Sequence, residues 1–447
     1  MPLAETSILE LWEGARAQLH QAAADAVFLE GSIAEGFGNE RSDVDFVGIV
    51  DDGSALPTMP YVMFVQDRRV EVRFLSSTRL RAQLGEVARA VREGPRAMAE
   101  LSWDLLDRCH RFLRCKPLHN PALIRTLQGE LPFEQLQQAV SSWFEDFSRQ
   151  TARYAVALRA LEQPEYACAW IRTATLHAAK CYAARLGETY VGLKWLSLQL
   201  GRAEVDETLV KRFWDFTHEP RGAAPDDYVK RGLDLVRALG VEGAEPELSN
   251  VRLGPRSGVT TWQIGERVHV VRGEDVFALG AEAAAVWRSI TWETPLVAVQ
   301  KRGEHLAEFA RMGLVALCWS DGDEIRARKH FTNGPVTALP LLSLDGAQLD
   351  GKRQVQLLPV PARRFAEAGM EMTWANIGLE NAREDAEGAL RRGQWRVLQY
   401  SLERVTQMGC LVALAAHGVS PAPPLEEATL EAMRLLPMEP SLVDDLR

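Results

Sequence analysis

The sequence predicts a multidomain α+β protein, and three observations support this fold class. The chain has 447 residues, which is more than one hydrophobic core usually organises. Its first 95 residues mix short apolar, strand-like runs with helical segments, whereas later stretches show the 3.6-residue spacing of amphipathic helices. The composition is that of a globular protein, with 47% hydrophobic and 25% charged residues. We therefore expect several domains that differ in secondary structure.

The order of these patterns along the chain divides it into four predicted domains. The first begins with an amphipathic helix over 6–25 and includes a hairpin turn at "QDRR" (66–69). A stretch rich in Gly, Pro and Glu at 240–250 indicates a linker. The predicted domains are 1–95 with a mixed β-sheet and helices, 96–240 with a helical bundle, 250–325 with a small β-plus-helix fold, and 326–447 with an extended segment followed by helices from 377.

Part of the helical sequence is repeated within the chain. Residues 157–182 align without gaps with 386–411, and each copy reads as a helix, a break at Pro164 or Gly393, and a second helix. Helix pairs rich in Ala and Leu often align by chance. Two explanations therefore stay open, namely coincidence, or two copies of one helical module packed around a shared site.

Charge and cysteine content exclude several classes of protein. The net charge of −10 argues against binding along a nucleic acid backbone, which needs a basic face. The six cysteines are scattered without a CxxC pair, so they form neither a zinc pattern nor a disulfide framework, and we expect buried free thiols. No signal peptide precedes the first helix, and no apolar run approaches the ~18 residues of a membrane-spanning helix. We expect a cytoplasmic protein without membrane association.

Acidic residues gather where a polar loop meets a strand. Asp43 and Asp45 are two residues apart at the start of the apolar run "FVGIV", so their side chains share one face of a strand. Glu71 stands alone among the apolar residues of a later strand, "VEVRF", and completes a three-carboxylate cluster if the two strands are adjacent. Three like charges repel one another, and hard oxygen ligands suit Mg²⁺, which also binds phosphate oxygens of a substrate.

The start of the same loop has the features of a phosphate-binding turn. Gly31 and Ser32 follow the apolar strand "AVFLE" and open a short predicted helix. Free backbone N–H groups and a hydroxyl at such a position can hold a phosphate, and glycine allows it a close approach. Together with the carboxylates, these residues are the parts required for metal-dependent phosphoryl or nucleotidyl transfer.

The string "GSIAEGFGNERSDVDFVGIV" (31–50), followed by "VEV", resembles the nucleotidyltransferase superfamily of DNA polymerase beta type, and in detail its antibiotic and minimal nucleotidyltransferase branches. The resemblance covers about residues 25–76. It implies an enzyme that transfers a nucleoside monophosphate, most simply AMP from ATP, and releases pyrophosphate. The residues it implies are Gly31, Ser32 and Ser42 for the nucleotide, Asp43 and Asp45 for Mg²⁺, and Glu71 as a third carboxylate that is either a metal ligand or a general base, with Asp67 as the next candidate.

A lysine in the helical region is a further candidate. Lys194 lies in "YVGLKWLSLQL" (190–200), at the start of a predicted helix. Related nucleotidyltransferases often carry a basic residue in this region, which implies a contact with the nucleotide or the acceptor. The alternative is a lysine whose stem lies along a buried Trp195 while its charge stays in water.

The third domain resembles the PqqD-like family of small winged-helix domains, which bind leader peptides of ribosomally synthesised precursors. The resemblance is carried by "VFALGAEAAAVW" (276–287) and "FARMGLV" (309–315). It implies that an extended peptide adds to a sheet edge around Arg267–Arg272. The segment "SITWET" stands where the family has "L-D-G", and the apolar residues are equally explained as the core of any small winged helix.

These observations lead to three functional hypotheses. The first is a Mg²⁺-dependent enzyme that adenylylates a precursor peptide presented by residues 250–325. The second is transfer to a small molecule such as an aminoglycoside-type antibiotic, because a cationic acceptor suits an acidic protein. The third is a non-catalytic peptide-binding scaffold. The sequence leaves the base of the nucleotide, the acceptor and the oligomeric state open.

Overall fold

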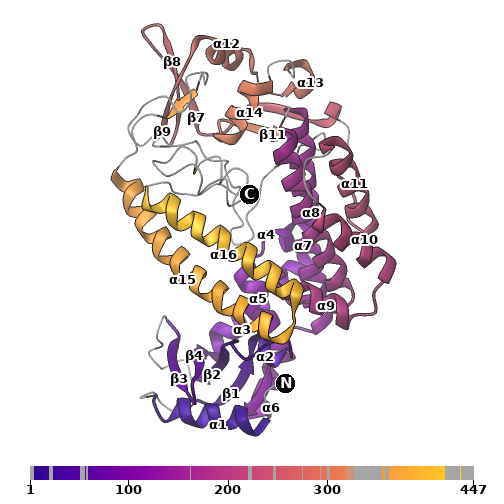
Figure 1. The fold of residues 1–447 in the computed structure, drawn as a ribbon, viewed down its shortest axis with the longest axis vertical. Coiled ribbons are helices and arrows are strands. Elements are labelled where there is room, and N and C mark those ends of the chain that lie inside the picture. The colour runs from indigo at the N-terminus through magenta and orange to yellow at the C-terminus, as the bar shows by residue number, and fades with distance from the viewer. Residues whose placement is uncertain are drawn as a thin grey trace. The chain divides into compact units, whose positions relative to one another are not determined.

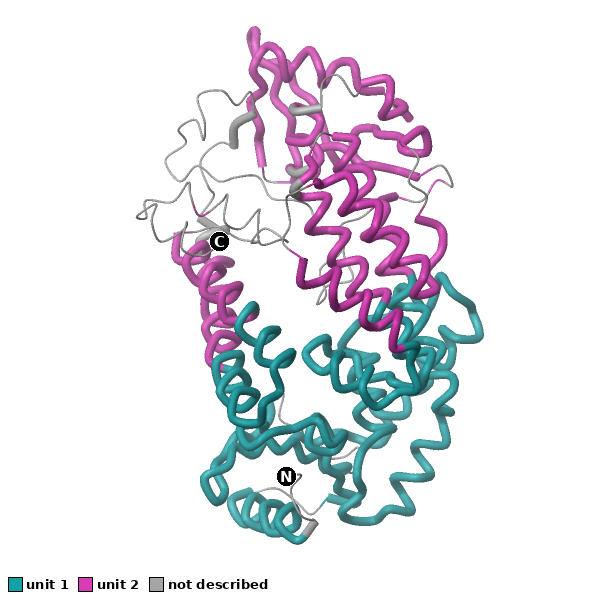
Figure 2. Tube along the Cα trace, turned by 45° about the vertical axis from the view of Figure 1, so that its right-hand side comes forward, with its two compact units in different colours: residues 1–145, 179–206, 381–403 teal, residues 146–178, 207–380, 404–447 magenta. Residues whose placement is uncertain are grey.

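The chain folds into two compact units, and both are discontinuous in sequence (Figure 2). Unit 1 comprises residues 1–145, 179–206 and 381–403, and unit 2 comprises 146–178, 207–380 and 404–447. Helices and several sheets are both present, so the α+β fold class is confirmed (Figure 1). The computed structural model describes residues 5–19, 24–50, 56, 59–161, 163–219, 224–244, 248–273, 275–291, 293–299, 303–319, 322, 324–325, 355–357, 362–417 and 433.

Unit 1 is built on a five-stranded sheet with several helices. Four helices cross from one unit to the other, so unit 1 contains only one end of each. The elements of unit 1 are α1 (Glu5–Arg16), β1 (Ala26–Glu30), α2 (Gly31–Ala34), β2 (Val44–Val50), β3 (Tyr61–Val65), β4 (Arg68–Ser76), α3 (Ser77–Glu93), α4 (Pro95–Glu100), α5 (Trp103–Leu113), β5 (Lys116–His119), α6 (Pro121–Gln128), η1 (Leu193–Trp195) and α9 (Leu196–Arg202), with parts of α7 (Phe133–Ala160), α8 (Pro164–Arg185), α15 (Ala362–Arg392) and α16 (Trp395–Ala416).

The sheet of unit 1 has the strand order β3-β4-β2-β1-β5, in which β2 and β4 are parallel and the other neighbours are antiparallel. All five residues of β1 are buried, as expected for a strand with both faces covered. Trp12 of α1 packs edge-on against Phe46 of β2, with ring centroids 5.4 Å apart. The apolar runs "AVFLE" and "VDFVGIV" therefore form the predicted strands in the middle of this sheet.

A hairpin turn lies within the predicted residues 66–69, but it consists of Gln66 and Asp67 alone, both in the left-handed region at φ 50° and 60°, because Arg68 and Arg69 already belong to β4. Two predictions of secondary structure were wrong. Residues 116–119, predicted as part of a helical region, form the edge strand β5; Pro117 cannot donate a backbone hydrogen bond, but an edge strand tolerates it. The last helical region starts with α15 at Ala362 instead of 377, because "ARRFAEAGM" consists mostly of good helix formers.

Unit 2 combines helices with two four-stranded sheets. The sheets have the strand orders β10-β6-β11-β12 and β13-β9-β8-β7. The elements that lie wholly in unit 2 are α10 (Glu207–His218), α11 (Pro225–Ala238), η2 (Leu248–Asn250), β6 (Arg252–Pro255), β7 (Val259–Ile264), β8 (Arg267–Arg272), β9 (Asp275–Leu279), α12 (Ala281–Ser289), β10 (Thr294–Pro295), α13 (Leu296–Val299), α14 (Gly303–Arg311), β11 (Val315–Cys318), β12 (Glu324–Ile325) and β13 (Val355–Leu357).

The predicted peptide-docking edge at Arg267–Arg272 is wrong. These residues form β8, which pairs along its whole length with β7 on one side and over Val268–Arg272 with β9 on the other. Both rows of its backbone hydrogen-bonding groups face neighbouring strands, so it has no free edge for an added peptide. Among the described strands, β7 lies at one edge of this sheet and β13 at the other.

Each copy of the internal repeat forms two consecutive helices with a short break. The break between α7 and α8 lies directly before Pro164, and that between α15 and α16 contains Gly393, whose φ is 64°. These are the two predicted break points. A common origin of the two helix pairs stays a prediction, because any two Ala- and Leu-rich helix pairs share this pattern.

The structure shows the state and burial of the cysteines and the polarity of the helices. All six cysteines are free thiols. Cys109, Cys168, Cys181 and Cys410 are buried, as predicted, whereas Cys115 and Cys318 are partly exposed. Within the described ranges, every helix is too short or too polar to cross a membrane.

The C-terminal helices contribute to unit 1 by packing on the loop between β1 and β2. The Gln394 side chain donates to the carbonyl oxygen of Phe37 and lies 3.5 Å from the Asn39 side-chain nitrogen. Ala389 and Val397 join Phe37 in a buried apolar cluster. A Cβ atom on Gly388 would lie 2.2 Å from Asn39 Oδ1, so this contact requires glycine.

We predict that Gly388→Ala destabilises the protein by about 1–2 kcal/mol through overpacking against Asn39, which is 2% exposed. The matched control is Gly409→Ala, another helical glycine, whose Cβ would meet nothing within 4 Å. Because alanine favours helix over glycine, the control is expected to raise the melting temperature while Gly388→Ala lowers it. A higher melting temperature for both variants in thermal denaturation would contradict this close packing.

Candidate active site

The predicted phosphate turn lies at the junction of β1 and α2. Gly31 begins α2 directly after β1 and has φ 76°, which favours glycine. A Cβ atom at this position would lie 2.4 Å from Asp45 Oδ2 and 3.2 Å from an Arg111 nitrogen. The turn therefore packs directly against the second predicted aspartate, and any larger residue would displace the carboxylate.

The structure brings the third carboxylate next to the first two. In the parallel pairing of β2 and β4, Asp45 lies directly opposite Glu71, and Asp43 immediately precedes β2. Glu71 is 9% exposed. Asp67, the other candidate, lies in the hairpin turn between β3 and β4 and does not line the pocket described below.

One pocket of unit 1 contains most of the predicted site residues. Gly31 is not among the lining residues, although a Cβ atom there would meet the carboxylate of Asp45, which lines the pocket. The predicted residues that line this pocket are Ser32, Ser42, Asp43, Asp45, Glu71 and Lys194. Residues far apart in the sequence therefore converge on one cavity, and we call it the active-site pocket.

Arginine side chains partly neutralise the three carboxylates. Arg69 lies 2.8 Å from Glu71 and 3.6 Å from Asp43, and Arg111 lies 3.6 Å from Asp45. In this conformation, no group of three or more His, Cys, Asp and Glu side chains in the described ranges converges in the manner of a metal centre. The carboxylates point toward guanidinium groups instead.

The arginines do not fully compensate the negative charge. Burial raises the pKa of Asp43 to about 7; Arg69 opposes this shift, whereas Glu71 and Asp45 add to it. Burial also raises the pKa of Asp45, although Arg111 opposes it. A further cation would relieve this repulsion, and carboxylate oxygens are the ligands that Mg²⁺ takes. The oxygen donors and their excess charge therefore suit Mg²⁺ chemically, while the side chains do not converge on one point in this conformation.

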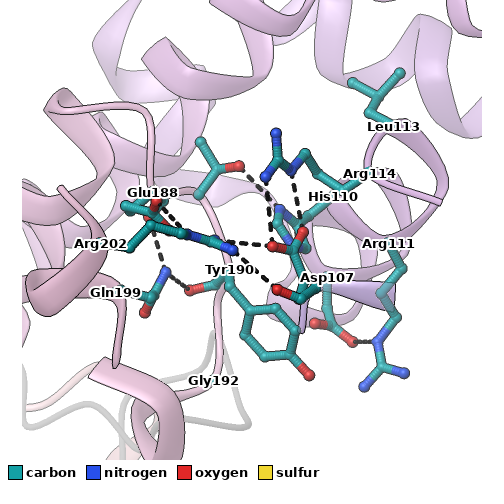
Figure 3. A network of polar contacts seen from close by, with 12 residues as sticks. Asp107, His110, Arg111, Leu113, Arg114, Glu188, Tyr190, Gly192, Gln199 and Arg202 are labelled. Atoms are coloured by element: carbon teal, nitrogen blue, oxygen red, sulfur yellow. Dashed lines mark hydrogen bonds and ion pairs between the residues drawn. The ribbon is translucent and has the colours of Figure 1, made fainter. Parts of the chain in front are cut away.

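An aspartate and an arginine of α5 belong to the pocket and were not predicted. Asp107 Oδ2 accepts a hydrogen bond from Arg111 Nε at 2.7 Å (Figure 3). Asp107 is 8% exposed, and its Oδ1 is buried without a hydrogen-bond partner in the described part of the chain. Both residues line the pocket. In the sequence they look like an ordinary helical i,i+4 pair, which is usually a solvated surface feature.

The end of α15 provides a second unpredicted wall. Asn381, Glu384 and Asp385 line the pocket, and Asp385 Oδ1 lies 2.7 Å from Lys194 Nζ. Lys194 also lies over the ring of Trp195, which is 1% exposed. Lys194 therefore packs on a buried tryptophan, as the alternative interpretation expects, but its charge pairs with Asp385 instead of staying in water. A contact with a nucleotide or an acceptor stays a prediction. Nothing in the local sequence around 381–385 indicates this contact.

A buried ionic network fixes the residues that follow the phosphate turn. Glu35, which follows α2, contacts His110 at 3.4 Å, Arg114 at 3.1 Å and Arg202 at 2.8 Å. Although burial raises the pKa of Glu35, its contacts with His110 and Arg114 lower it below its usual range. Figure 3 shows Arg202 extending to Glu188 as well, with 2.6 Å between Arg202 Nε and Glu188 Oε1. The network joins α2 to α5 and α9 and so restrains the turn.

A buried lysine holds the opposite side of the pocket. Lys180 of α8 is fully buried and donates to the backbone oxygens of Tyr190 and Gly192 and to Gln199 Oε1. Burial lowers its pKa to about 7. Because Tyr190 and Gly192 line the pocket, Lys180 positions this wall without entering the site.

Comparison with known proteins adds little to this geometry. Neither a family model nor a curated protein matches the sequence. Among solved structures, a nucleotidyltransferase-like protein from Exiguobacterium sibiricum matches 52% of this chain and 74% of its own chain, with 13% identity and a TM-score of 0.30. A similarity this distant carries no argument about function, which must come from the site itself.

We predict that Asp43→Asn stabilises the metal-free protein at alkaline pH. The folded-state pKa of Asp43, about 7, lies above its ordinary value of 3.8, so folding favours the neutral side chain. The penalty for the charged form is absent below about pH 4, grows as the pH rises to about 7, and is constant above that. With EDTA present, thermal denaturation should show a gain of about 1–2 kcal/mol at pH 8, after allowance for partial solvent screening, and almost none at pH 4.

The matched control is Glu93→Gln on α3, an exposed carboxylate outside the pocket. It removes the same charge from unit 1 and should leave the stability nearly unchanged at both pH values. A loss of stability for Asp43→Asn at pH 8 would show that Arg69 compensates the cluster completely.

Proposed function

We propose that this chain is a Mg²⁺-dependent nucleotidyltransferase. In the reaction, an acceptor hydroxyl oxygen attacks the α-phosphorus of ATP, and the bond from that phosphorus to the bridging oxygen of the β-phosphate breaks. AMP becomes attached to the acceptor, pyrophosphate leaves, and the hydroxyl proton passes to a base or to solvent. The observation that carries the proposal is the opposed pair Asp45 and Glu71, packed against the Gly31 turn in a single pocket.

Each predicted residue has a role in this proposal. Asp43 and Asp45 would hold Mg²⁺, which neutralises phosphate charge and polarises the reacting phosphate when bound. Glu71 would either complete the ligand set or take the acceptor proton. Ser32, Ser42 and Lys194 line the same pocket and would contact the nucleotide. The two rigid networks around Glu35 and Lys180 keep these walls in place.

One observation favours a small acceptor that carries hydroxyl or amino groups. The buried Oδ1 of Asp107 has no hydrogen-bond partner among the described residues, and Asp107 lines the pocket near Trp103 and Tyr190. An unpaired buried carboxylate oxygen is costly unless a ligand donates to it. An acceptor with such donors would satisfy Asp107 at the edge of the reaction centre.

Transfer to a precursor peptide remains a second candidate. The edge strand β7 presents Trp262 and Ile264 at 54% and 56% exposure, and a peptide could pair with this strand instead of β8. The PqqD-like resemblance is the reason to consider this acceptor. Testing a panel of aminoglycosides and a panel of short peptides as acceptors distinguishes the two candidates. The small-molecule candidate predicts product with the aminoglycosides alone, and the peptide candidate predicts product with the peptides alone.

We predict that Asp45→Asn abolishes pyrophosphate release from Mg²⁺-ATP with whichever panel supports turnover. Loss of a charged ligand removes several kcal/mol of transition-state stabilisation, so the rate should fall by at least about 100-fold. The control is Asp25→Asn, an exposed aspartate beside β1 that does not line the pocket. Retention of more than about a tenth of the wild-type rate would exclude the proposed metal site. No turnover by the wild-type protein with any acceptor would favour the scaffold alternative.

A further inference from the structure

Two carboxylates of α15 form ion pairs with basic side chains that could otherwise contact a triphosphate. Lys194 Nζ lies 2.7 Å from Asp385 Oδ1, and Arg41 lies 3.5 Å from Glu387. Asp385 lines the pocket, whereas Glu387, two residues further along the same helix, does not, although its partner Arg41 does. In the ligand-free protein, carboxylates of α15 therefore neutralise two of the cations around the active-site pocket.

The pair formed by Lys194 and Asp385 is placed to respond to a ligand. Both residues line the pocket, and their side chains are only partly buried, at 24% and 27% exposure. The Lys194 ammonium also lies 4.4 Å from the centroid of the Trp195 ring, a cation–π contact that keeps the charge at the pocket wall beside Asp385. Lys194 thus has two possible anionic partners, the Asp385 carboxylate and a bound phosphate.

We propose that Asp385 determines the affinity of the pocket for polyphosphate nucleotides by competing with them for Lys194. This inference rests on the proposed function, in which the nucleotide triphosphate binds in this pocket. A phosphate that pairs with Lys194 must displace Asp385 or share the ammonium with it, and the free energy of that exchange is lost from binding. Glu384 lies beside Asp385 on the pocket wall and adds to the repulsion of a polyanion.

A purely structural role for the pair predicts the opposite effect. If the contact only fixed α15 to the wall that carries Lys194, breaking it would loosen the pocket and weaken nucleotide binding. Competition instead predicts that neutralising Asp385 strengthens binding, and that this gain requires Lys194. The sign of the change and its dependence on Lys194 therefore separate the two explanations.

The experiment is isothermal titration calorimetry of the full chain with the α,β-methylene analogue of ATP in excess Mg²⁺. Asp385→Asn should tighten binding about fivefold, the scale expected for release of a partly exposed ion pair, and Lys194→Met should weaken it. In the Lys194→Met background, the same Asp385→Asn change should alter the Kd less than about twofold, because the competing partner is gone. The exposed Glu93→Gln variant controls for the loss of one negative charge from unit 1.

The outcomes separate this inference from the proposed function. Weaker binding by Asp385→Asn, no change, or an equal gain in the Lys194→Met background would overturn the competition while leaving nucleotide binding intact. A wild-type chain that shows no Mg²⁺-dependent binding would overturn the proposed function, and the inference with it. Circular dichroism melting of each variant distinguishes a changed pocket from a chain that fails to fold.

Discussion

Repulsion between carboxylates on two adjacent parallel strands is the constraint around which unit 1 is organised. Asp45 and Glu71 face each other in register, Asp43 lies two residues from Asp45, and burial weakens the screening that water would provide. The surrounding structure supplies guanidinium groups from two separate elements, Arg69 on β4 and Arg111 on α5. These contacts offset part of the repulsion, yet they leave Asp43 with a raised pKa. Carboxylates whose pKa values are perturbed in this way are candidates for a functional site.

Other segments of unit 1 form the remaining walls of the pocket, and buried contacts hold them in place. The phosphate turn is fixed through Glu35, whose contacts reach α5 and α9, and the wall at Tyr190 is fixed through Lys180. The end of α15 then closes a further side with carboxylates that pair with Lys194 and Arg41. The polar groups that face the pocket are therefore held by buried contacts behind them, which is the arrangement that a preorganised site requires.

Local sequence was enough to predict the sheet and the carboxylates but not the walls of the pocket. The i,i+2 spacing of Asp43 and Asp45 and the isolated Glu71 in an apolar strand carry their geometry with them, because strand periodicity places such side chains on one face. Asp107 and Arg111 instead have the spacing of a common surface pair, and their burial comes from tertiary packing. Asp385 meets Lys194 across 191 residues of sequence, so no local pattern could indicate the contact. The predicted docking strand failed for a related reason, since only pairing on both sides shows that β8 is internal.

The central claim of the proposal is that Asp43 and Asp45 hold a cation once a nucleotide is present. Electron paramagnetic resonance of Mn²⁺ tests it directly, because bound Mn²⁺ loses the sharp signal of the free ion and the titration counts sites without any acceptor. The wild-type chain with the α,β-methylene analogue of ATP should bind Mn²⁺ well beyond the amount bound by the analogue alone, and Asp45→Asn should bind it more weakly. Equal Mn²⁺ binding in the presence and absence of the protein would contradict the account.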